Sequence, residues 1–182
     1  MTRTGTIALA LGLALLGSGD AATLAGRDAA ARPAFTETQW PFLLDPWGPG
    51  RAYRCAAAAC AGEVAVFVRG KSGFCNCYNG VADDDEIDRI GDVDLHSPDF
   101  LPLAPGQVTR VGERAGRTRA FRVATAGGPR QILSIVVASR CNALVATVVS
   151  TGELAPAVER AVFDLLEGAP VQRFITQASV EP

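Results

Sequence analysis

The residues with the clearest chemical potential are five cysteines: Cys55, Cys60, Cys75, Cys77 and Cys141. Cysteines form structural disulfides in oxidising compartments, whereas their thiolates bind metals or exchange disulfides. In a secreted chain, the odd number predicts up to two disulfides and one spare thiol. Structural disulfides are the main interpretation, and a thiol-based metal site or a redox function is the alternative.

Geometry restricts which cysteines can pair, because bridged Cα atoms lie about 4.4–6.8 Å apart. Cys55 and Cys60 can pair if the segment CAAAAC is a hairpin loop. If its alanines form a helical turn, the two thiols lie about 140° apart on the helix and cannot pair. Cys75 and Cys77 share one face of an extended strand, so each is expected to pair elsewhere. Cys141 is the natural distant partner, and a bridge closing a loop of about 65 residues would stabilise by roughly 3–4 kcal/mol.

The same thiols could instead hold a metal ion. Cys55, Cys60, Cys75 and Cys77 supply four thiolates, the number that a structural zinc site needs. Copper(I) also prefers thiolate ligands. If the thiols react, Cys75 and Cys77 are the expected pair, because their segment GFCNCYNG is short and polar.

An acidic run at 83–94 is the second candidate site. It can be a solvated face, a docking surface for a basic partner, or a calcium site, since Ca²⁺ takes about six to eight oxygen ligands. The EF-hand pattern is not met, because Ile87 occupies a ligand position. The run could also be balanced internally by the arginines at 110, 114, 117, 119, 122 and 130. Its acidic members are Asp83, Asp84, Asp85, Glu86, Asp88, Asp92 and Asp94.

No familiar catalytic constellation accompanies these groups. His96 is the only histidine, and its polar surroundings (LHSPDF) predict a surface position. The sequence contains no GxSxG, GxGxxG, Walker A or HExxH motif. The sequence therefore favours a non-enzymatic protein with no cofactor, and zinc, copper and calcium follow only from the alternatives above.

The N-terminus predicts export. Residues 1–21 have the form of a signal peptide, with Arg3, an apolar stretch at 7–16 and small residues after it. Residues 22–34 are expected to be a flexible tether and 35–182 a single domain. The net charge of −2 and 48% hydrophobic content predict a globular protein with no nucleic-acid partner and no membrane span after signal removal. Lys71 is the only lysine among many arginines, which together with the signal suggests a bacterial periplasmic or secreted protein.

The chain predicts mainly strands. Residues 35–50 contain three prolines and are expected to be irregular, packed across a sheet through Trp40, Phe42, Leu43 and Trp47 or forming an aromatic lip around a ligand. A short helix in the acidic run should stop at Gly91, and Pro156 should begin a longer helix ending at Glu167. Strands are expected at 51–55, 63–70, 107–112, 118–124, 131–139, 143–151 and 171–175, with the pair 131–139 and 143–151 as the central hairpin.

The second half of the chain resembles the PsbP/Mog1-like domains. The similarity rests on the order of TRAFRVATAGGPRQILSIVV, NALVATVVST and ELAPAVERAVFDLLEG within residues 107–177. It implies an α+β fold in which an antiparallel sheet lies between helices as an α/β/α sandwich. No functional residue transfers from it, and such domains are mostly binding or assembly-support proteins.

The residues and the resemblance together predict an exported non-enzymatic accessory or binding protein. Its partner would be another periplasmic protein or assembly, and its contact surface would be the acidic segment 83–94 or the aromatic lip. The alternative is a zinc, copper or redox protein that uses Cys75 and Cys77.

Overall fold

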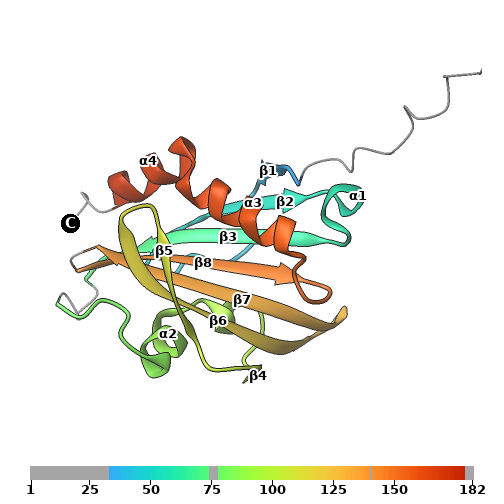
Figure 1. Cartoon of the computed structure of the whole chain (residues 1–182), viewed down its shortest axis with the longest axis horizontal. Helices are drawn as coiled ribbons and strands as arrows, with labels where there is room; N and C mark the ends of the chain where they lie inside the picture. Colours follow the sequence, from blue (N-terminus) through green and yellow to red (C-terminus); the bar gives the residue numbers. More distant parts are fainter. Residues whose placement is uncertain (1–32, 74–77, 140, 179–182) are drawn as a thin grey trace, which may run out of the picture.

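An antiparallel sheet of eight strands forms the centre of the molecule (Figure 1). The computed structural model describes residues 33–73, 78–139 and 141–178. The strand order is β1-β2-β3-β8-β7-β6-β4, and β5 also pairs with β6. The predicted α+β class is therefore confirmed. The predicted signal peptide (1–21) and nearly all of the tether (22–34) lie outside the described residues.

The first three strands form one side of the sheet. The predicted hairpin is confirmed, because β2 (Arg51–Cys55) pairs with β3 (Val64–Lys71). Strand β1 (Phe35–Thr38) pairs with β2, so the prediction that 35–50 is irregular throughout was wrong. The physical reason is that the prolines of 35–50 lie at position 41 and beyond, which leaves the preceding FTET segment free to extend.

The second half supplies the rest of the sheet. Strands β7 (Gly128–Ser139) and β8 (Asn142–Ser150) form the predicted central hairpin. Strand β6 (Arg114–Thr125) begins four residues before the predicted start at 118. The other two strands of this half are β4 (Phe100–Pro102) and β5 (Gln107–Val111).

Two glycines shape the beginning of β6. Gly112 has a φ of 56°, a left-handed conformation that lets a two-residue turn join β5 to β6. Gly116 lies inside β6, where a Cβ atom would collide with the backbone of Val136. This glycine therefore marks a close approach between strands.

In the part of the chain that the structure describes, four helical segments and one 3₁₀ turn complete the fold. Helix α2 (Asp84–Ile90) ends at Gly91, and α3 (Pro156–Glu167) has the predicted bounds. The predicted strand at 171–175 was wrong, because α4 (Ala169–Ala178) occupies it and buries Val171 and Ile175 at helical spacing. The shorter elements are α1 (Ala57–Cys60) and the 3₁₀ turn η1 (Val93–Leu95). None of the helices in the described ranges is long and apolar enough to cross a bilayer.

Helices contact both faces of the sheet. On the face we call the α3 face, Val162 and Leu166 of α3 and Val171 of α4 join one core with residues of β2, β3, β7 and β8. On the opposite α2 face, Ile87 and Ile90 pack against residues of β7 and β8. The α2 face is also where the charged side chains of the acidic run lie, and it carries the candidate site.

Candidate functional site

Part of the α2 face remains open between strand β7 and the aromatic segment, which is the part of 35–50 that contains Trp40, Phe42 and Trp47. The strand register places Thr36, Arg54, Ala65, Val149 and Ile132 in one row across β1, β2, β3, β8 and β7. Side chains in such a row point to the same side of a sheet. The first four residues of this row line a hollow beside α2.

We call this hollow the sheet cavity, and its volume is about 540 Å³. Pockets of about 300–1,000 Å³ are the usual size for small-molecule sites. The floor is apolar and the edges carry charge, a combination that holds the body of a ligand by contact and orients it by polar groups. The residues that define it here are Arg54, Ala65, Phe67, His96, Arg130 and Val149.

Two arginines and one glutamate give the sheet cavity its charge. Among the described residues, neither Arg54 nor Arg130 forms an ion pair. Arg54 is exposed on β2, whereas Arg130 on β7 is half-buried and donates one long hydrogen bond of 3.5 Å to the carbonyl of Pro129. Glu63 is exposed and also lines the cavity. The lining of the cavity therefore carries two guanidinium groups and one carboxylate.

His96 contributes a neutral imidazole to the wall. Its ring contacts the rings of Phe42 and Phe67, with centroids 5.0 and 4.9 Å away. Burial lowers its pKa to about 4, against the opposing effect of the Asp92 charge. Its Nε2 atom is buried and has no hydrogen-bond partner within the described part of the chain. The surface position predicted for His96 was wrong, because Phe42 folds over it.

A buried ion-pair cluster lies beside this wall. The guanidinium of Arg69, which is 3% exposed, donates to both carboxylate oxygens of Asp92 at 2.5 and 2.6 Å and to Asp45 at 2.6 Å. Lys71 pairs with the same Asp92 at 2.8 Å. Burial alone would raise the pKa of Asp45, but the hydrogen bond and charge of Arg69 outweigh it and lower that pKa. These groups neutralise one another across a second cavity of about 390 Å³.

The acidic run of the sequence makes most of its contacts inside the molecule. Arg117 pairs with Asp84 at 2.8 Å, and Arg119 pairs with Asp88 at 2.7 Å. The backbone N–H of Gly106 also donates to Asp84 and is the main cause of its lowered pKa. Burial raises the pKa of Asp88 in spite of Arg119.

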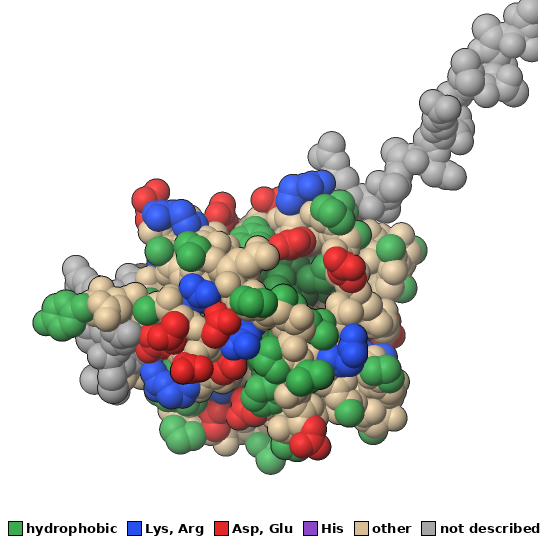
Figure 2. Space-filling model, turned by 60° about the horizontal axis from the view of Figure 1, so that its bottom comes forward, with side chains coloured by type: hydrophobic (Ala, Val, Ile, Leu, Met, Phe, Trp, Pro, Cys, Tyr) green, Lys and Arg blue, Asp and Glu red, His purple; other side chains and the backbone are tan. Residues whose placement is uncertain are grey.

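The remaining acidic residues divide into structural and exposed groups. Asp83 caps α2 by accepting a hydrogen bond from the N–H of Glu86, and the buried Glu86 accepts one from Arg89 at 3.0 Å. Asp85 and Asp94 are exposed. Acidic and basic side chains lie next to one another on the side of the molecule that Figure 2 shows. The structure thus brings the run together with arginines of β6, as the sequence allowed, and leaves few of its carboxylates unpaired.

In the described ranges 33–73, 78–139 and 141–178, no three His, Cys, Asp or Glu side chains cluster in a way that could hold a metal ion. The calcium interpretation would use carboxylates that Arg117, Arg119, Arg69 and Lys71 already contact.

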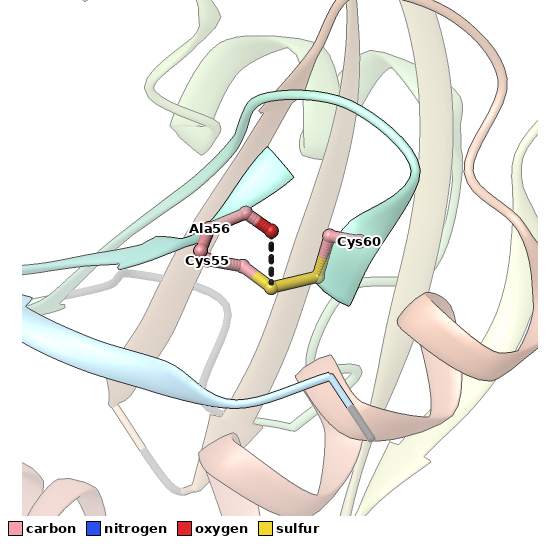
Figure 3. Close-up of a disulfide and its surroundings, with 3 residues drawn as sticks. All are labelled: Cys55, Ala56 and Cys60. Atoms are coloured by element: carbon pink, nitrogen blue, oxygen red, sulfur yellow. Dashed lines mark hydrogen bonds between the residues drawn. A yellow bond between two sulfur atoms is a disulfide. The ribbon is translucent and has the colours of Figure 1, made fainter. Parts of the chain in front are cut away.

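The first two cysteines form a disulfide (Figure 3). Cys55 and Cys60 have Cα atoms 6.1 Å apart, although Ala57–Cys60 is a helical turn. The prediction that a helical turn prevents this bridge was wrong, because Cys55 belongs to β2 and only Cys60 lies on the helix. The sulfur of Cys55 also lies 3.7 Å from the Ala56 carbonyl oxygen. Because this sulfur belongs to the disulfide and carries no hydrogen, the contact is not a hydrogen bond.

The other cysteines are described in part. Cys141 is disulfide-bonded, while Cys75 and Cys77 lie outside the described residues. A site with the four thiolates of Cys55, Cys60, Cys75 and Cys77 would require reduction of the bond between the first two.

The aromatic segment divides into a packed and an exposed part. The rings of Trp40 and Phe42 contact each other at 5.1 Å, and Phe42 contacts Phe67 at 5.2 Å. Leu43 is 93% exposed, so the prediction that it is buried was wrong. Trp47 is also exposed, and its ring lies 5.6 Å from the ammonium of Lys71. Phe42 thus supports the wall of the sheet cavity, as a lip would.

Sequence reasoning did not find Arg54 and Arg130. Neither belongs to a motif, and they lie on strands that are distant in the chain. The alternation in RAYRC carries a usable signal, because buried Tyr53 and Cys55 place Arg54 on the opposite face. The meeting of that face with β7 depends on strand order, which the sequence pattern does not specify.

Comparisons with known proteins place the chain in no family. No family model and no curated protein matches it. One solved structure, a protein of unknown function from Pseudomonas aeruginosa, is similar with 14% identity and a TM-score of 0.35, covering 77% of this chain and 84% of that one.

Proposed function

We propose that this chain is an exported, non-enzymatic binding protein of the bacterial periplasm and that the sheet cavity holds its ligand. The observation that carries the proposal is the cavity itself, with an apolar floor of Ala65, Phe67 and Val149 and two arginines that lack ion pairs among the described residues. Concave, mostly apolar hollows with a few placed polar groups are the usual form of ligand sites. The contacts of helices with both sheet faces support retaining the PsbP/Mog1-like sandwich as part of this proposal.

The chemistry of the cavity favours binding over catalysis. A general acid or base works best when its pKa lies near the operating pH. The pKa of His96 is lowered to about 4, so at neutral pH its imidazole is a weak base and lacks the imidazolium proton that a general acid would donate. Guanidinium groups are charged hydrogen-bond donors and have no acceptor for a proton. These groups orient a ligand but do not move its protons.

The cavity is a better candidate contact surface than the acidic segment 83–94. Asp84, Asp88 and Asp92 are held by basic groups of the sheet, so a basic partner would compete with internal ion pairs. Exposed Asp85 and Asp94 remain accessible, which is a small surface for a stable protein complex.

Export is tested by expressing the full chain in a Gram-negative host and fractionating the cells. We expect the mature protein in the periplasmic fraction, with a mass that corresponds to loss of about 21 residues at the N-terminus. Recovery of the full-length chain from the cytosol would contradict the localisation.

Binding is tested by isothermal titration calorimetry with 2-naphthamide, a neutral probe with a flat apolar body. We expect saturable binding that Ala65→Phe abolishes, because the larger side chain fills the floor of the cavity. Ala126→Phe, at an exposed turn outside the cavity, is the matched control and should bind normally. Absence of binding to the wild-type protein, or equal binding by both variants, would overturn the assignment of the cavity as the site.

A further inference from the structure

We infer that the sheet cavity selects an organic anion with an apolar body, of the size of an aromatic monocarboxylate; this inference rests on the proposed ligand site. Arg54 and Arg130 would receive the carboxylate, and Phe67 with Val149 would contact the body. Within the described part of the chain, neither guanidinium is paired with an acidic side chain. The cavity therefore has a charge preference and an apolar surface in the same volume.

The charge of the lining favours an anion. Arg54 and Arg130 carry two positive charges, Glu63 carries one negative charge, and His96 is neutral at pH 7. A guanidinium presents its N–H groups in a planar fork that matches a carboxylate, and such charge-assisted hydrogen bonds are stronger than neutral ones. A cationic ligand would meet two like charges at the same rim.

The position of the two arginines fits a ligand that lies across the strands. Arg54 stands on β2 and Arg130 on β7, and β3 and β8 lie between these two strands in the sheet. Ala65 and Val149 follow Arg54 in the row, whose β7 member is Ile132, and Arg130 lies two residues away from Ile132 along β7. An anion at either guanidinium would have its apolar part over these small and branched side chains.

The aromatic wall adds a second point of recognition. Phe67 and His96 both line the cavity, and the centroids of their rings lie 4.9 Å apart. The buried Nε2 of His96 has no hydrogen-bond partner among the described residues. A buried polar atom without a hydrogen bond is unfavourable, so a ligand group that pairs with it gains affinity. Aromatic bodies are favoured because they can contact the edge or face of Phe67.

The test compares 2-naphthoate with 2-naphthamide, two probes of the same shape that differ in charge. Isothermal titration calorimetry at pH 7.5 should give a Kd for 2-naphthoate at least tenfold lower than for 2-naphthamide. Arg54→Gln and Arg130→Gln should each reduce this difference, and the double variant should remove most of it, with a smaller effect on 2-naphthamide binding than on 2-naphthoate binding. Arg160→Gln removes the same charge from the exposed side of α3 and should leave both constants unchanged.

Each pattern of results has a distinct meaning. Binding of neither probe overturns the proposed function. Equal binding of both probes keeps the cavity as a ligand site and overturns the anion preference. A preference for 2-naphthoate that Arg160→Gln reduces as much as Arg54→Gln also overturns the inference, because the effect would then come from net charge alone. Glu63→Gln should strengthen 2-naphthoate binding, and a weakening would contradict the electrostatic argument.

Discussion

At the scale of single residues, charge is buried only where it is paired. Arg69 and Asp92 are 3% exposed each, and they contact one another through two hydrogen bonds. Moving an ion out of water is costly, so each member of the pair depends on the other. Lys71 and Asp45 complete the charges of the cluster. This cluster fixes the loop after α2 to strand β3 and thereby holds one wall of the sheet cavity.

Substitution of Asp92 tests that dependence. Asp92→Asn removes the carboxylate that accepts from both Arg69 and Lys71, so it should reduce the free energy of unfolding by about 3–5 kcal/mol in urea denaturation. Asp94→Asn is the matched control, because Asp94 is exposed and its change should stay within about 0.5 kcal/mol. A loss below about 1 kcal/mol for Asp92→Asn would show that water already screens the cluster.

His96 predicts a pH dependence of stability. Its pKa is lowered from 6.5 to about 4 in the folded protein, so between these values the unfolded chain binds more protons. The stabilisation from the neutral ring is complete above pH 6.5 and is lost as the pH falls toward 4, by up to about 3 kcal/mol. His96→Phe keeps an aromatic ring against Phe42 and Phe67 but cannot titrate.

The measurement is urea denaturation of both proteins at several pH values from 7 to 4. We expect the free energy of unfolding to fall more steeply for the wild type than for His96→Phe in this window. The facing carboxylate of Asp92 and the cations of Arg54 and Arg130 are present in both proteins, so their effects largely cancel in the difference. Parallel curves would show that His96 is solvated and not protected by burial.

The sequence could predict some of these residues and not others. The balance of the acidic run by Arg117 and Arg119 was among its alternatives, because opposite charges in one small domain tend to pair. The burial of His96 was not predictable from its neighbours LHSPDF, since it comes from Phe42, far away in the chain. Local composition reports what a residue prefers, whereas its final contacts depend on which distant segment packs there.

At the scale of elements, patterns with one dominant apolar face were predicted well. Helix α3 has Pro156 at its start and an apolar stripe that meets the sheet, and its predicted bounds are confirmed. The segment VQRFI in α4 was predicted as a strand because it is short and contains branched and aromatic residues. The sign of a helix is the spacing of Val171 and Ile175, which are four residues apart and are both buried. The order of the strands, which creates the sheet cavity, is not contained in any single pattern.

The packing of α3 gives a prediction at this scale. Leu166 is 0% exposed in the core of the α3 face, so Leu166→Ala should lower the free energy of unfolding by about 2–5 kcal/mol. Leu101, on the edge strand β4, is 61% exposed, and Leu101→Ala should change it by no more than about 0.5 kcal/mol. Denaturation in urea measures both. Similar losses for the two variants would contradict the assignment of α3 as the cover of the main core.

At the scale of the whole molecule, the sheet is stabilised by cover on both faces and by covalent links. The α3 face has one extended apolar core, whereas the α2 face has smaller apolar clusters separated by buried ion pairs. The disulfide between Cys55 and Cys60 closes the turn between β2 and β3, next to the sheet cavity that Cys55 also lines. A bond of this kind persists in an oxidising compartment, which connects the fold to the proposed export.

The cysteine count gives the corresponding prediction. The chain has five cysteines, and Cys55, Cys60 and Cys141 are all disulfide-bonded. Because a disulfide consumes two cysteines, protein purified from the periplasm without reductant should titrate with one thiol per molecule in guanidinium chloride. The double variant Cys55→Ser, Cys60→Ser should also show one thiol. Its free energy of unfolding should be lower by about 2 kcal/mol, because the lost disulfide closes only a short loop. Full reduction should give five thiols in the wild type and three in the variant. Three or more thiols before reduction, with bound zinc or copper, would instead support the thiol-based metal function.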